Sequence, residues 1–145
     1  MFDFEKLDLY QEIRGINALM MKWVQDHPNM DDYVAEQFKT LLIGIASKLA
    51  EGTARMGYQE KKRCYTESRV NVFECVTLLH IMKDVGTIDE ERFEEFYEEL
   101  DKISRMLLGM IRSQRSHRDR GRDRGYQSDS HSPDQSSGGD RDEDS

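Results

Sequence analysis

Histidines and carboxylates are the first residues to consider, because helical bundles often bind iron or manganese. Di-iron and di-manganese bundles hold their ions with Glu-x-x-His pairs, whose two side chains project from one face of a helix. The sequence has four histidines, His27, His80, His117 and His131, and none has a glutamate three residues before it. We therefore expect no bound metal and no other cofactor.

Gly52 and Gly57 have the spacing of the two glycines in a phosphate-binding P-loop. That loop also needs a lysine and then Ser or Thr after the second glycine, where this sequence has Tyr58 and Gln59. A P-loop also follows a β-strand, and the sequence predicts no strand at this point. We interpret the two glycines as marking the end of a helix.

Cys64 and Cys75 are the only cysteines, and their separation of eleven residues places them on roughly one helix face. A nucleophilic cysteine needs a base nearby, and the sequence supplies none. Two cysteines without CxxC spacing also fit neither a metal site nor a secreted disulfide scaffold. We predict buried free thiols in a cytoplasmic protein that has no catalytic residue and is not an enzyme.

Carboxylates are concentrated between residues 90 and 101, where they alternate with Phe93, Phe96, Tyr97 and Leu100. This alternation is typical of a helix with one apolar face and one solvated acidic face. We therefore interpret the acidic cluster as a solvent-exposed surface and not as a catalytic or metal-binding site.

The net charge of −8 limits the partners of the protein. Residues 1–113 carry 15 Lys and Arg against 21 Asp and Glu, and residues 114–145 carry 6 against 8. An acidic balance argues against general coating of nucleic acid but leaves room for a local basic patch. No apolar run approaches the roughly 18 residues of a membrane span, so we expect a soluble protein without a membrane partner.

The chain divides into two parts at about residue 113. Beyond that point Tyr126 is the only apolar residue, so residues 114–145 cannot form a core and are predicted to be a disordered tail. Residues 112–124 hold six arginines and two aspartates, a composition that suits either an RNA-binding arm or a solubilising tail. The interspersed aspartates and the acidic residues 140–144 favour the solubilising tail.

Residues 1–113 have the apolar spacing of four helices, over about 9–24, 34–49, 58–84 and 93–110. Asn29 is the expected N-terminal cap of the second helix, and Gly86 is the expected stop of the third. Either a capping box from Thr87 to Glu90 or Asp89 alone begins the fourth. Short connections place successive helices antiparallel. We predict an all-α, antiparallel up-down-up-down four-helix bundle with a disordered C-terminal tail.

The third helix is too apolar for a solitary bundle, since nine of the thirteen residues from Val70 to Met82 are apolar. Either this helix is central and deeply buried, or one face packs inside the protomer while another meets a neighbouring copy. Large exposed apolar patches usually mark interfaces. We therefore predict a homo-oligomer with an interface formed by Val70, Phe73, Leu78 and Ile81.

A local basic patch is expected around the start of the third helix, with Tyr58 and Tyr65 interleaved. Its members are Arg55, Lys61, Lys62, Arg63 and Arg69. Contact with phosphates and stacking on bases use these residue types. The alternative is an ordinary charged helix start that balances acidic neighbours, and the sequence leaves both interpretations open.

Three short motifs resemble a known family, the bacterial four-helix bundle proteins encoded in intervening sequences of 23S ribosomal RNA genes. The motifs are Ala50-Glu51-Gly52 with Arg55, Gly86 with Ile88, and Leu107–Ser113 at the close of the fourth helix. Before the first motif, Gly44–Leu49 lacks the proline and asparagine that are usual in the family.

The resemblance implies a protomer that assembles as a homopentamer and associates with RNA or a ribonucleoprotein without catalysis. A related branch is the accessory proteins of diversity-generating retroelements, which partner a reverse transcriptase and its template RNA. That branch is strongly basic, whereas this chain is acidic. A third hypothesis is an adaptor that binds proteins only.

Overall fold

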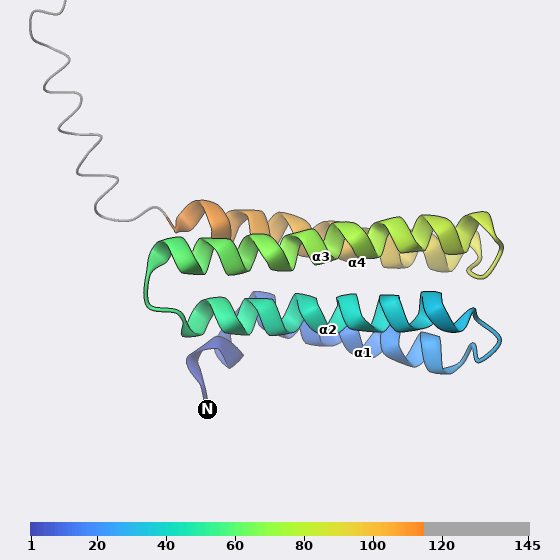
Figure 1. Cartoon of the computed structure of the whole chain (residues 1–145), viewed down its shortest axis with the longest axis horizontal. Helices are drawn as coiled ribbons and strands as arrows, with labels where there is room; N and C mark the ends of the chain where they lie inside the picture. The colour runs from blue at the N-terminus through green and yellow to red at the C-terminus, as the bar shows by residue number, and fades with distance from the viewer. Residues whose placement is uncertain (115–145) are drawn as a thin grey trace, which may run out of the picture. The chain divides into compact units, whose positions relative to one another are not determined.

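The computed structural model describes residues 1–114. A short 3-10 helix, η1 (Asp3–Lys6), precedes four α-helices, which are α1 (Asp8–Gln25), α2 (Asp32–Ala54), α3 (Tyr58–Asp84) and α4 (Glu90–Ser113). The helices alternate in direction, with α1 and α2 in one layer and α3 and α4 in the other (Figure 1). The predicted all-α up-down-up-down bundle is confirmed. The predicted tail lies outside the described residues, apart from Gln114.

Each helix packs against the next along the chain, and α1 also packs against α4. Helix α3 is therefore diagonal to α1. The core between the four helices is made of apolar side chains spaced three or four residues apart. Its largest fully buried members are Phe38, Phe96, Ile13, Met20, Leu42, Ile45, Leu49, Leu79, Met82, Leu100, Ile103 and Leu107.

Short polar signals set the helix ends. The Asp31 side chain accepts a hydrogen bond from the Val34 amide at 3.0 Å, so Asp31 caps α2 and the expected cap at Asn29 is wrong. Asp89 alone caps α4 by accepting from the Arg92 amide at 2.7 Å. Gly86 follows α3 with φ of +84°, a conformation that glycine adopts without steric cost.

Helix α3 is buried on one face only. Cys64, Tyr65, Ser68, Val72, Cys75, Leu79 and Met82 point into the protomer. Val70, Phe73 and Ile81 remain 48%, 54% and 43% exposed. The interpretation of α3 as a helix enclosed by its own chain is therefore wrong, and an apolar face is left uncovered within the described residues. None of the described helices is long and apolar enough to cross a membrane.

Candidate interaction surfaces

An apolar strip runs along the outside of α3. We call it the outer α3 face and define it by Thr66, Val70, Phe73, Thr77 and Ile81, all of them exposed. Spacings of three and four residues keep these side chains on one side of the helix, opposite the buried face. From Val70 to Ile81 the strip is about 17 Å long at 1.5 Å per residue.

Three of the four predicted interface residues lie on the outer α3 face, namely Val70, Phe73 and Ile81. Leu78 is half-buried instead and packs against the core. Leu78 lies seven residues, or about two turns, after Asn71 and therefore on the same side of α3. The Asn71 side chain faces Gly44 of α2. Leu78 therefore belongs to the packing between α2 and α3.

A groove of about 430 Å³ lies beside the outer α3 face, between α3 and α4. The rings of Phe73, His80 and Tyr97 line part of it, and the centroid of His80 lies 6.4 Å from that of Tyr97. The Arg69 guanidinium lies 4.9 Å from the centre of the Phe73 ring. Aromatic and cationic groups thus extend the apolar surface toward α4.

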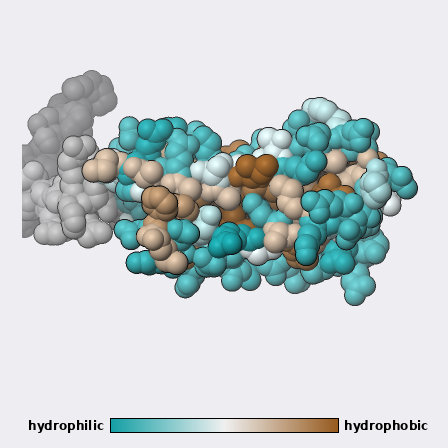
Figure 2. Space-filling model, turned by 90° about the horizontal axis from the view of Figure 1, so that it is seen from below, coloured by the Kyte–Doolittle hydropathy of each residue, from teal (hydrophilic) through white to brown (hydrophobic). Residues whose placement is uncertain are grey.

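A second exposed apolar residue, Ile43, lies on α2 and is 56% exposed. It follows Glu36 and Lys39 on one side of α2, and these two residues border a groove shared with α1. The face formed by α1 and α2 has hydrophobic side chains near its middle, within a hydrophilic surround (Figure 2). The sequence did not predict Ile43 as a surface residue, because Ile43 lies outside the regular apolar spacing of the second helix.

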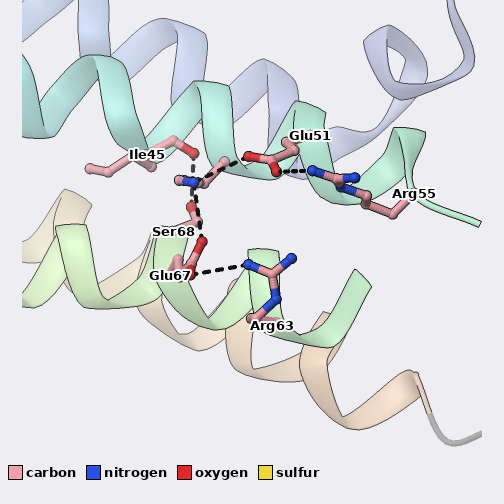
Figure 3. Close-up of polar contacts among 7 residues, drawn as sticks. Ile45, Glu51, Arg55, Arg63, Glu67 and Ser68 are labelled. Carbon is pink, nitrogen blue, oxygen red and sulfur yellow. Dashed lines mark hydrogen bonds and ion pairs between the residues drawn. The ribbon is translucent and has the colours of Figure 1, made fainter. Parts of the chain in front are cut away.

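Two of the predicted basic residues, Arg55 just after α2 and Arg63 near the start of α3, are held in ion pairs (Figure 3). Arg55 pairs with Glu51 at 2.8 Å, and Arg63 pairs with Glu67 at 3.4 Å. Lys48 joins the two pairs at 3.2 Å from each carboxylate. The hydrogen bond from Arg55, with that from Lys48, holds the pKa of Glu51 at about 2.

The remaining basic residues have different surroundings. Lys61 donates to the carbonyl oxygens of Gly52 and Thr53 at 3.2 and 3.1 Å, so it stabilises the C-terminal end of α2. Arg69 is turned toward α4, where its Nε donates to the carbonyl and hydroxyl oxygens of Ser104 at 3.2 and 3.1 Å. Lys62 is exposed. The structure therefore gathers Arg55, Lys61 and Arg63 near the α2–α3 connection and separates Arg69 from them.

Helix α2 ends at Ala54, between Gly52 and Gly57, so the two glycines bracket its end as predicted, and Gly52 itself is a buried position in the last turn. A Cβ atom on Gly52 would lie 2.5 Å from Cε1 and 2.8 Å from Cδ1 of Tyr65, whose ring is buried. A real Cβ cannot approach ring carbons that closely. The glycine therefore lets α3 pack directly against the last turn of α2.

Both cysteines are free and buried, in agreement with the sequence-based prediction. Burial raises the pKa of the Cys75 thiol to about 12, so it stays protonated at neutral pH. Among residues 1–114, no group of three or more His, Cys, Asp and Glu side chains is placed to hold a metal ion.

The family model of the 23S rRNA-intervening sequence proteins matches residues 5–109. A similar solved structure is a protein of unknown function from the S23 ribosomal protein family of Bacteroides thetaiotaomicron, which is 11% identical with a TM-score of 0.68. The alignment covers 71% of this chain and 97% of that chain, and at this identity it shows a shared fold. No curated protein matches the sequence. Because the family model spans well over half of the chain, this protein belongs to the 23S rRNA-intervening sequence protein family.

Proposed function

We propose that the protein is a non-catalytic homo-oligomeric scaffold that associates with RNA or a ribonucleoprotein. The observation that carries the proposal is the outer α3 face, where Val70, Phe73 and Ile81 are about half exposed on the side opposite the core. Soluble proteins seldom leave such a strip uncovered unless a partner binds it. A second copy of the chain is the partner always present at matching concentration, and the family resemblance suggests five copies.

The free energy gained by burying this face indicates how large the contact between copies must be. Fully burying a Val, Ile or Phe side chain contributes about 1.5–3 kcal/mol. Covering the exposed half of these three side chains therefore contributes roughly 3 kcal/mol. A micromolar dissociation constant corresponds to about 8 kcal/mol. The contact must therefore include more surface than these three residues.

The test is the mass of the particle in solution, measured by light scattering after size exclusion. We expect wild type to be oligomeric at micromolar concentration and Phe73→Arg to be smaller. Tyr33→Arg is the matched control, because Tyr33 is 72% exposed but lies on α2, away from the outer α3 face. A wild-type monomer at tens of micromolar would overturn the proposed self-association.

RNA association rests on the family to which the chain belongs and on the cations near the α2–α3 connection. The side chains of Arg55 and Arg63 are 45% and 54% exposed despite their ion pairs. Exposed ion pairs contribute about 0–1 kcal/mol, so phosphate groups can replace the carboxylates at little cost. Lys62, which precedes Arg63 in the chain, adds a third exposed cation.

Binding of a structured fragment of 23S rRNA at about 50 mM salt tests this part of the proposal. We expect a triple alanine variant of Arg55, Lys62 and Arg63 to bind more weakly than wild type. Lys39→Ala is the control, because Lys39 is a similarly exposed, ion-paired cation near the other end of α2. Equal affinity of wild type and the triple variant would exclude this site.

Two alternative partners remain predictions: a reverse transcriptase with its template RNA, and a protein bound without RNA. One experiment separates a protein partner from an RNA partner, namely affinity purification of the full chain with and without nuclease. A protein partner retained after nuclease treatment would favour an adaptor, and loss of all partners would favour RNA.

A further inference from the structure

We infer that the groove between α3 and α4 binds an unpaired nucleotide of RNA, with the phosphate on Arg69 and the base against the rings of His80 and Tyr97. This inference rests on the proposed RNA association and goes beyond it. It adds a contact on another side of α3 from Arg63, and it states which form of RNA that contact recognises.

Arg69 crosses the groove and divides it into two hollows. Its Nε donates to both oxygens of Ser104 on α4, and its guanidinium lies 4.9 Å from the centre of the Phe73 ring. Arg69 and Phe73 line the larger hollow of about 430 Å³, which extends to Tyr97, and also the smaller one of about 210 Å³, which extends to Leu108. The guanidinium is thus held in place with a hollow on each side.

The two terminal amino groups of Arg69 have no hydrogen-bond partner among residues 1–114. Arginine has five N–H donors, and here only Nε is engaged, by Ser104. Arg69 is half-buried, and arginine side chains withdrawn from water are usually paired with an anion because desolvating a charge is costly. The planar fork of unused donors matches the oxygen atoms of a phosphate or a carboxylate. The groove therefore lacks an oxyanion that Arg69 could bind.

Helix α4 changes from acidic to cationic along the groove. Residues 90–101 include seven carboxylates, whereas residues 104–114 include none and carry Arg105 and Arg112. These two arginines are seven residues apart, so they lie on one side of α4, and Arg105 lines the larger hollow. Asp101 also lines it and is paired with Arg105. Arg69 and Arg112 therefore add positive charge to this part of a chain whose net charge is −8.

Cations recur on both helices at intervals of about two turns. Lys62, which is exposed, precedes Arg69 by seven residues on α3, as Arg105 precedes Arg112 on α4. Seven residues correspond to about 10 Å. A carboxylate of a protein partner would occupy Arg69 alone, whereas a nucleic acid backbone presents successive phosphates to a row of cations. The repetition therefore favours a nucleic acid.

Aromatic rings in the larger hollow favour an unpaired base. Phe73, His80 and Tyr97 line this hollow, and Tyr97 is 40% exposed. Tyr97 precedes Ser104, the partner of Arg69, by seven residues or about 10 Å along α4. The volume of the hollow is within the usual range for one small ligand. Bases of duplex RNA are stacked inside the helix, so only a loop, a bulge or a single strand can place one in the groove.

The affinities for two RNAs, measured by fluorescence anisotropy at about 50 mM salt, test the inference. One RNA is a hairpin with an unpaired loop, and the other is a duplex with the same number of phosphates. We expect Arg69→Gln to bind the hairpin roughly 10- to 150-fold more weakly than wild type does, the range for hydrogen bonds to a charged group, with a much smaller loss for the duplex. Arg14→Gln is the control, because Arg14 is exposed on α1 and has no ion pair with any described residue.

Tyr97→Leu tests the base contact separately, and it keeps the inference testable if Arg69→Gln fails to fold. Loss of one stacked base should weaken hairpin binding roughly 5- to 150-fold and leave duplex binding unchanged. Tyr33→Leu is the matched control, because Tyr33 is an exposed tyrosine on α2. Both control variants should bind the two RNAs as wild type does.

The failures of this inference and of the proposed function give different results. Absence of binding of either RNA to wild type would overturn both. Hairpin binding that is unchanged in Arg69→Gln and Tyr97→Leu would overturn the inference alone, and so would equal losses for hairpin and duplex. Light scattering of Arg69→Gln should give the wild-type mass; a smaller particle would mean that the groove holds a second copy of the chain instead of RNA.

Discussion

Replacing Gly52 with alanine is the sharpest test of how α2 and α3 pack together. The new Cβ would lie 2.5 Å from Cε1 of Tyr65 and 3.1 Å from Cβ of Cys64. Tyr65 is only 2% exposed, so its ring has no free space to enter. The helices must therefore separate or the ring must leave its rotamer.

Gly44 supplies a matched control, since it lies on the same helix and also faces α3. A Cβ on Gly44 would lie 2.5 Å from Nδ2 of Asn71, which is the end of a flexible side chain and can rotate away. Either substitution gains about 1 kcal/mol of helix propensity. Crowding a packed core costs about 1–3 kcal/mol. Because the propensity gain is common to both, Gly52→Ala should be less stable than Gly44→Ala by about 1–3 kcal/mol.

Urea unfolding followed by far-ultraviolet circular dichroism measures this difference, at one protomer concentration because assembly shifts apparent stability. Adding Tyr65→Phe to Gly52→Ala should not restore stability, since the crowded atoms are ring carbons that phenylalanine retains. Equal stability of Gly52→Ala and Gly44→Ala would refute the close approach of the two helices.

Three further predictions concern polar and titratable groups. Ser68→Ala removes a buried 2.8 Å hydrogen bond from Ser68 Oγ to the carbonyl of Ile45, and should cost about 0.5–1.5 kcal/mol in the urea titration. Glu51 has a folded-state pKa of about 2, below its ordinary 4.5, so its contribution to stability is complete above pH 4.5 and is lost as the pH falls toward 2. Wild type should therefore lose more stability than Glu51→Gln over that range, and identical pH profiles would contradict the ion pair. Cys75, buried and protonated, should react with a thiol reagent at neutral pH only as fast as the protein opens, and immediate reaction would contradict its burial.

Helix boundaries and the bundle were predictable because the responsible signals are local. Gly86 ends α3 since the next turn requires a positive φ, and Asp89 begins α4 since its carboxylate reaches an amide three residues later. Asn29 and Asp31 are both good capping residues, and their propensities do not distinguish them. The choice of Asp31 reflects where the chain turns after Met30, which is buried against the core.

The surfaces were harder to predict because they depend on which side of each helix faces a neighbour. Leu78 and Ile81 are equally apolar in the sequence, yet one packs toward α2 and the other is exposed. Arg63 and Arg69 are both arginines of α3, but they lie six residues apart and therefore point to different sides of the helix. As a result, Arg69 reaches Ser104 on α4. Gly52 has the same ambiguity, since a glycine near a helix end suits both a stop signal and a close helix contact.

Salt should separate the two activities proposed for the protein, because apolar contacts and phosphate contacts respond to it differently. If Arg55, Lys62 and Arg63 each neutralise one phosphate of duplex RNA, affinity should fall by roughly 0.9 log units per contact for a tenfold rise in salt, or about 500-fold in total. Self-association through the apolar side chains of the outer α3 face should persist or strengthen, because salt screens the repulsion between copies of charge −8. Fluorescence anisotropy of labelled RNA and light scattering, both between about 50 and 500 mM salt, measure the two responses. An oligomer that dissociates as salt rises would mean that charge pairs hold the copies together, contrary to an apolar contact through the outer α3 face.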